Sequence, residues 1–223
     1  MLGHQARGIV VLVFAIAAAA CGGKKADSNS SADAEVKVSA IDQLKGISVD
    51  LQAQLDALMA PINEVDALVE QITSMPARLK LNASELMGMF KASADGGQVQ
   101  LSANIEADAM AKAEVEGVLA KLKGIVDGLK AIPENTKLLA GKAGAALVAV
   151  PTLGVKAQSE LTVKASNPFG KPEEKAQAQA DLQSLAQIQT DVQGTIQGIQ
   201  QKIMELPALA TSALAKLTAS FAS

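Results

Sequence analysis

The chain has 223 residues, a formal net charge of −3, 49% hydrophobic and only 2% aromatic residues, with a single cysteine and a single histidine. Acid–base catalysis most often uses histidine, and nucleophilic triads need a base beside serine or cysteine. The only histidine, His4, and the only cysteine, Cys21, both precede residue 36, so residues 36–223 cannot build a His- or Cys-based active site. The slightly acidic balance, without clustered Lys/Arg or stacking aromatics, sets nucleic-acid binding aside.

Residues 1–20 are typical of a secretory signal peptide. Arg7 supplies a positive charge, and residues 9–20 form an apolar run that is too short to span a bilayer. Small residues then lead directly into Cys21. A lone cysteine can also be a small buried hydrophobe. A structural zinc site needs four ligands and a disulfide needs a second cysteine, so neither can be built on Cys21.

The stretch Ala18-Ala19-Ala20-Cys21 resembles the signal of bacterial lipoproteins, in which the cysteine is lipidated and becomes the first residue of the mature chain. The family pattern is Leu, two small residues and Cys, so Ala18 stands at the Leu position. The resemblance implies membrane attachment through acyl chains on Cys21. It also implies sorting to the outer membrane, because Gly22 is not the Asp that commonly signals retention in the inner membrane.

Residues 21–35 are predicted to form the lipidated cysteine and a flexible tether. The sequence "GGKKADSNSSADA" after Cys21 is rich in Gly, Ser, Ala and charge and has no large apolar residue. Such a segment cannot bury enough apolar surface to fold. Random-coil scaling gives it a reach of roughly 20 Å.

A heptad pattern after the tether predicts a first long helix. Apolar residues recur at alternating spacings of three and four, which is the coiled-coil period, with Ser48 as the only polar member. Ser39 with Asp42 is a plausible N-cap. The pattern continues through Pro61 and predicts one kinked helix rather than two. Its positions are Ile41, Leu44, Ser48, Leu51, Leu55, Leu58, Ile62, Val65, Val69 and Ile72.

A second heptad run predicts a helix over residues 115–132. Its positions are Val115, Val118, Leu122, Ile125, Leu129 and Ile132. Before it, residues 98–107 alternate apolar and polar after a turn signal and are predicted as a strand. The Ala and Glu content of residues 98–107 is equally compatible with an early start of the following helix.

The segment "LLAGKAGAALVAVPTLGV", residues 138–155, is nearly all small or apolar, with Lys142 as its only charge. We favour a fully buried helix over residues 133–150, because a short run that includes Pro151 is more often core than membrane. The alternative is a segment that leaves the bundle and enters a bilayer, as in helical pore-forming toxins. Residues 154–166 alternate with period two and are predicted as a strand that pairs with residues 98–107.

A third heptad run predicts the last helix. It begins near Pro172, which suits the first helical position, and Glu173 and Glu174 suit the positive end of the helix dipole. The heptad positions are Leu182, Leu185, Gln189, Val192, Ile196, Ile199, Ile203 and Leu206. The outer face carries glutamines, which we interpret as a solvated face and, less favoured, as a partner-binding face: Gln177, Gln179, Gln183, Gln187, Gln193, Gln197, Gln200 and Gln201.

Two further patterns concern proline and glycine. Each heptad run meets a proline in the same way, at Pro76, Pro133 and Pro207, which indicates a weak repeat without the regular period of a solenoid. Two glycine pairs with a spacing of four lie off the heptad stripes. They are equally compatible with a second tight helix contact and with chance. These pairs are Gly124/Gly128 and Gly194/Gly198.

Stripes of this kind must be buried against one another, so the fold is predicted as mainly α. We expect an elongated helical bundle of coiled-coil-like heptad helices over residues 36–223 and, if both strands form, a minor two-stranded β element. The expected role is a non-enzymatic structural or interaction module of the bacterial cell envelope, anchored in the outer membrane. The alternative is a lipid-binding or membrane-perturbing helical protein.

No catalytic residue, metal ligand, cofactor or small-molecule substrate is predicted. The expected partners are the membrane, through acyl chains on Cys21, and a protein partner or a second copy that binds through the heptad helices.

Overall fold

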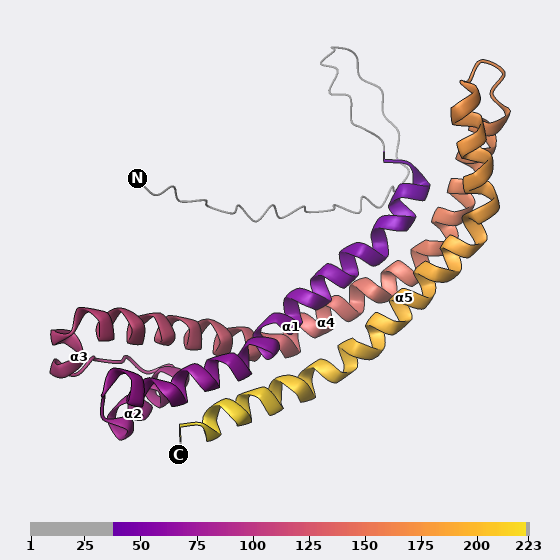
Figure 1. Cartoon of the computed structure of the whole chain (residues 1–223). Helices are drawn as coiled ribbons and strands as arrows, with labels where there is room; N and C mark the ends of the chain where they lie inside the picture. Colours follow the sequence, from indigo (N-terminus) through magenta and orange to yellow (C-terminus); the bar gives the residue numbers. More distant parts are fainter. Residues whose placement is uncertain (1–37, 222–223) are drawn as a thin grey trace, which may run out of the picture. The chain divides into compact units, whose positions relative to one another are not determined.

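Three long helices, α1 (Ala40–Leu79), α4 (Ala109–Ser166) and α5 (Pro172–Ala219), form an elongated bundle (Figure 1). Two short helices, α2 (Ala83–Ala94) and α3 (Ala103–Ala107), connect α1 to α4. The structure is a computed structural model that describes residues 38–221. Within this range it is all-α and contains no strand, so the predicted mainly helical bundle is confirmed.

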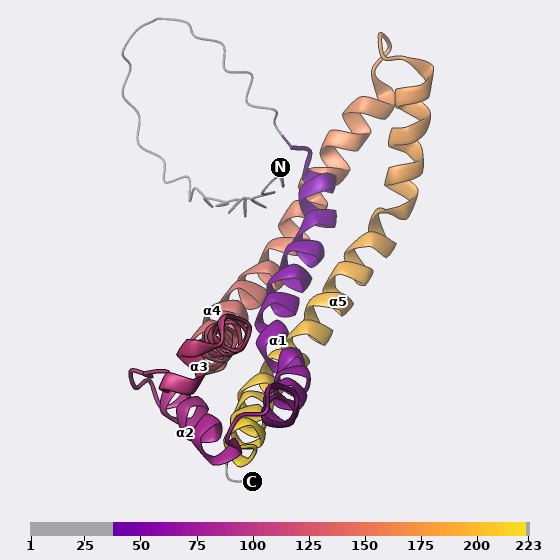
Figure 2. The same ribbon diagram turned by 60° about the vertical axis from the view of Figure 1, so that its left-hand side comes forward.

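Polar contacts define the helix directions. The Ala40 backbone N–H donates to Glu160 Oε2 at 2.9 Å, and Arg78 at the other end of α1 forms an ion pair with Glu114. α4 therefore runs antiparallel to α1. Lys45 Nζ lies 3.8 Å from Asp181 Oδ1. The start of α1 and the α4–α5 connection consequently lie at one end of the bundle, and α2, α3 and the end of α5 lie at the other (Figure 2).

The predicted heptad positions form the core. All six of the α4 run are buried, from Val115 to Ile132. In α1 the predicted positions Ser48, Leu58, Ile62 and Val69 are half-buried, and the other six are buried. In α5 only Leu182 and Gln189 are half-buried. The three stripes are therefore buried against one another within a single chain.

The N-terminus of α1 has the predicted cap. The Ser39 side chain accepts a hydrogen bond from the Asp42 backbone N–H at 3.2 Å. The helix continues through Pro61, as predicted, and ends three residues after Pro76. There Lys80 takes a left-handed conformation with φ 55°, and the Leu81 N–H donates to the Pro76 carbonyl oxygen at 3.0 Å. α4 and α5 continue past Pro133 and Pro207, and Pro76 lies inside α1, so none of these three prolines ends its helix.

The predicted two-stranded element is wrong. Residues 154–166 are the last part of α4, and residues 98–107 comprise an irregular stretch followed by α3. The alternating pattern misled because Val150, Gly154, Ala157 and Leu161 also follow a 4-3-4 helical spacing, and these four are buried. With small residues on every side of the segment, both periods fit. The burial of one helical stripe against α1 and α5 then favours the helix over the strand.

Gly154 of α4 and Gln189 of α5 lie directly against each other. Gln189 is the one polar member of the α5 stripe, and a Cβ at Gly154 would lie only 1.3 Å from Gln189 Nε2. The buried glycine on α4 therefore leaves the space into which the glutamine side chain of α5 extends. The glutamine that interrupts the apolar heptad pattern of α5 is therefore located where α4 and α5 approach closely.

Helix α2 is an element that the sequence reading missed. Its N-cap Asn82 accepts a hydrogen bond from the Glu85 backbone N–H at 3.2 Å, and it buries Leu86, Met89 and Phe90. The signal was present in the capping residue Asn82 and in the spacing of these three apolar residues. It spans little more than three turns, too short to stand out beside the long heptad runs.

The first glycine pair makes a close contact at only one of its two positions. A Cβ at Gly128 would lie 3.1 Å from Pro61 Cβ and 3.2 Å from its Cγ, whereas a Cβ at Gly124 would meet nothing within 4 Å. Gly194 and Gly198 likewise have open space. The tight helix contact is therefore between Gly128 of α4 and the Pro61 ring of α1.

This difference predicts opposite outcomes for two identical substitutions on α4. Gly124→Ala should stabilise the protein by about 0.5–1 kcal/mol, because alanine restricts the unfolded chain and favours the helix. Gly128→Ala should give no gain, because the rigid Pro61 ring must move away from the new methyl group. Urea titrations followed by circular dichroism measure both. Equal stabilisation by the two would contradict the Gly128–Pro61 contact.

Candidate functional site

The site residue predicted from sequence, Cys21, lies outside the described residues, as do the signal peptide 1–20 and the tether 21–35. The structure describes where the chain enters the bundle. Val38 and Ser39 lie beside α4 and line a hollow with Lys156, Ser159, Glu160, Val163 and Lys164. The first two described residues therefore lie against the last part of α4.

A continuous uncharged stripe runs along the exposed side of α4 next to this point. We call it the α4 outer face. Its residues recur at spacings of three and four and are all exposed: Leu138, Gly141, Ala145, Val148, Thr152, Val155, Ser159 and Val163. The four large side chains, Leu138, Val148, Val155 and Val163, are 62%, 77%, 69% and 66% exposed. These four are among the most exposed large apolar residues of the bundle.

The prediction of a fully buried helix over residues 133–150 is therefore wrong. The segment belongs to the continuous helix α4, and its buried residues are confined to one stripe, with Leu139, Ala143 and Val150 among them. Among the described helices, α4 alone is long and apolar enough to span a membrane by length and composition, and only 22% of its most apolar window is buried. The physical reason is geometric: two neighbours, α1 and α5, cover only the sides of α4 that face them.

The charges around the α4 outer face are mostly positive. Residues 134–166 contain two acidic residues, Glu134 and Glu160, and four lysines: Lys137, Lys142, Lys156 and Lys164. Glu160 accepts the hydrogen bond from the Ala40 backbone, and Lys142 Nζ donates to Gln54 Oε1 at 2.7 Å. The stripe thus combines exposed apolar side chains with flanking ammonium groups.

The connection between α4 and α5 adds one large aromatic side chain. Phe169 is 95% exposed in this loop, and its backbone N–H donates to Asn167 Oδ1 at 3.0 Å. Pro168 and Lys171 are also exposed. The loop lies at the same end of the bundle as the start of α1 (Figures 1 and 2). The most exposed aromatic residue of the described chain is therefore at the end of the bundle at which α1 begins.

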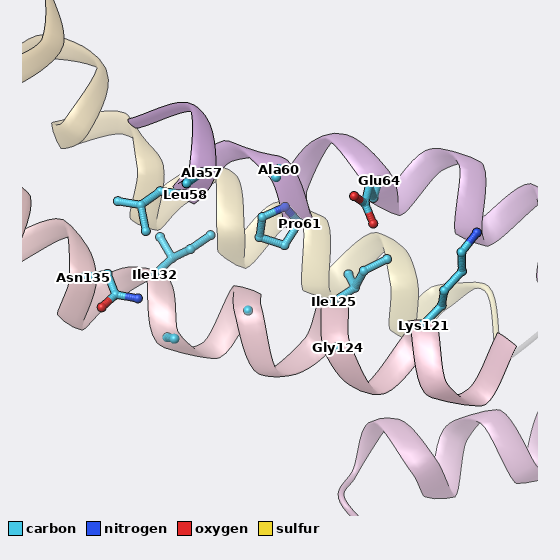
Figure 3. Close-up of a pocket in the computed structure, with 12 residues that line it drawn as sticks. Ala57, Leu58, Ala60, Pro61, Glu64, Lys121, Gly124, Ile125, Ile132 and Asn135 are labelled. Carbon is cyan, nitrogen blue, oxygen red and sulfur yellow. The ribbon is translucent and has the colours of Figure 1, made fainter. Parts of the chain in front are cut away.

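A second feature is a shallow groove between α1 and α4 (Figure 3). Small and apolar residues form most of its wall, including Ala57, Pro61 and Gly124, and its volume is about 340 Å³. Glu64 and Lys121 lie toward one end and Asn135 toward the other. These groups are exposed; Glu64 belongs to α1, whereas Lys121 and Asn135 both belong to α4. They offer an acid, an ammonium and an amide, but no nucleophile with an adjacent base.

Within residues 38–221, no cluster of three or more His, Cys, Asp or Glu side chains is placed to hold a metal ion. The glutamines of the outer face of α5 are exposed or half-buried, so they are available to solvent. The heptad stripes, by contrast, are occupied within the chain. The surface that stands out for interaction in the described part is the α4 outer face with Phe169.

Comparison of the chain with known protein families, with curated proteins and with solved structures gives no match.

Proposed function

We propose that this protein is a bacterial outer-membrane lipoprotein, held by acyl chains on Cys21, whose helical bundle acts as a non-enzymatic structural or interaction module of the cell envelope. The observation that carries the proposal is the position of Cys21 directly after an apolar run and three alanines. A hydrophobic run of that length with a small-residue cleavage site is a secretion signal rather than a membrane span.

The fold supports a role without catalysis. The described bundle is built from heptad stripes that are buried against one another, and residues 38–221 contain no His, Cys, Tyr or Trp. The side chains available for chemistry are therefore carboxylates, lysines, one arginine, amides and hydroxyls on exposed helix faces. A long helical bundle at the end of a tether suits a spacer or a docking module.

Membrane perturbation is a second candidate function, and one observation favours it. The apolar residues of the α4 outer face are exposed to solvent rather than buried as the sequence suggested. Exposed apolar patches on soluble domains often mark sites of interaction with proteins or membranes. The acyl anchor and this surface are compatible, so the two candidates differ in whether the bundle leaves the bilayer intact.

The anchor is tested by Cys21→Ser. We expect this substitution to abolish acylation and signal-peptide cleavage, because no other cysteine is present in the chain. Metabolic labelling of the producing bacterium with a clickable fatty acid, followed by intact mass measurement, reports both steps. The matched control is Ser30→Ala in the tether, which should leave labelling unchanged. Equal labelling of wild type and Cys21→Ser would refute the lipoprotein assignment.

A further inference from the structure

We infer that the α4 outer face, together with Phe169, lies on the surface of the lipid bilayer that holds the acyl chains of Cys21. This inference rests on the proposed function for the position of the anchor. It specifies the partner of the bundle as the bilayer itself, and it gives the bundle an orientation in which α4 is closest to the membrane.

The first argument is the chemistry of the surface. Interfacial helices combine an apolar stripe with lysines whose ammonium groups reach anionic head groups while their methylene chains stay near the apolar boundary. The α4 outer face has exposed Leu138, Val148, Val155 and Val163, and four lysines against two glutamates, Glu134 and Glu160, lie along it. Phe169 extends the apolar surface beyond the end of α4.

The second argument is the place where the anchored chain enters the bundle. Residues 22–37 separate Cys21 from Val38. A chain of this length spans at most about 60 Å, even fully extended. Val38 lines the same hollow as Ser159 and Val163 of the α4 outer face, and Val38 is itself exposed. Anchoring at Cys21 therefore keeps this end of α4 near the bilayer.

The third argument excludes a crossing helix. Leu139, Ala143, Val150 and Ala157 are buried on the opposite side of α4 against the rest of the bundle. For α4 to span the bilayer, these contacts would have to open, and the apolar stripes of α1 and α5 would lose the surface against which they are buried. If α4 lies on the membrane surface, its outer face contacts the bilayer while its buried face stays packed in the bundle.

The four lysines favour a surface of anionic head groups over a parallel contact with a second copy, which would pair each lysine with itself. A two-fold contact centred near residue 150 would bring Lys142 of one copy equally near Lys156 and Glu160 of the other, so its charges do not exclude it. The test below therefore separates membrane contact from self-association.

The test uses the full-length acylated protein in vesicles of phosphatidylethanolamine and phosphatidylglycerol, with some of the lipid spin-labelled. A fluorophore is attached at Val155→Cys and, in a matched control, at the exposed Gln197→Cys on α5. We expect the lipid spin label to quench the fluorophore at residue 155 several-fold more than the one at 197. Adding Val148→Asp should reduce quenching at 155, whereas Val49→Asp, at a similarly exposed valine on α1, should not.

Three outcomes would overturn the inference. Equally weak quenching at residues 155 and 197 would show that the face does not contact lipid. Quenching at 155 by a spin-labelled copy of the protein instead of by lipid would assign the face to self-association. Release of an entrapped dye that Val148→Asp abolishes would assign α4 to insertion. The intact mass of the same sample reports the acyl chains on Cys21, so failure of the anchor is distinguished from failure of the membrane contact.

Discussion

Leu122→Asp is expected to remove most of the stability of the bundle. Leu122 is fully buried in the α4 stripe and belongs to the hydrophobic core of the bundle. Truncating a buried leucine alone costs about 2–5 kcal/mol. An unpaired carboxylate in its place adds several kcal/mol of desolvation. Domains of this size are stable by about 5–15 kcal/mol, so the sum approaches the whole free energy of unfolding.

The matched control is Ala120→Asp, which places the same charge two residues away on the exposed side of α4. It should change the free energy of unfolding by roughly 0.5 kcal/mol, as exposed substitutions usually do. Urea titrations of both variants, followed by far-ultraviolet circular dichroism, measure the difference. If the two midpoints shift by similar amounts, Leu122 is not in the core and the arrangement of α4 is wrong.

The heptad stripes could be predicted from the sequence because they repeat over many turns. Val115, Leu122 and Ile132 are predicted and found at buried positions of α4. The continuation of α1 through Pro61 was also predicted, because the apolar pattern keeps its phase across the proline. A long pattern outweighs one unfavourable residue, since tertiary packing contributes more to helix stability than local propensity.

The side of α4 that would be buried beyond Ile132 could not be predicted in the same way. From Leu138 to Val155 nearly every residue is small or apolar, so no polar face indicates where solvent lies. Burial there depends on how many helices surround α4, which composition does not specify. Residues 154–166 were misassigned for a related reason, because a mixture of small residues fits a period of two and a period of 3.6.

The two parts of the candidate site also differ in whether the sequence alone could predict them. Cys21 is read from the first 21 residues alone, and its role stays a prediction because it lies outside the described residues. The α4 outer face required the structure, since only the placement of α1 and α5 reveals which apolar residues are left exposed. A second 3-4 spacing from Leu138 to Val155, out of phase with the buried stripe, was the available signal.

A second large difference in stability is expected between substitutions of two phenylalanines, because one is buried and the other is exposed. Phe90 of α2 is fully buried and is among the largest side chains in the core, whereas Phe169 is almost entirely exposed. Phe90→Ala should lower the free energy of unfolding by about 3–5 kcal/mol, because it leaves a cavity where α2 packs on the bundle. Phe169→Ala should leave the urea midpoint within about 0.5 kcal/mol of wild type.

The two phenylalanine variants also separate folding from membrane contact. Phe169→Ala should keep the urea midpoint but weaken lipid quenching of a fluorophore at residue 155, because it removes apolar surface at the α4–α5 connection. Phe90→Ala should lower the midpoint and leave lipid quenching unchanged wherever the bundle is still folded, because α2 lies at the opposite end from Phe169 (Figure 1). A large loss of stability in Phe169→Ala would instead place that ring in a folded contact. The α4–α5 connection would then be part of the core rather than part of the surface that contacts the bilayer.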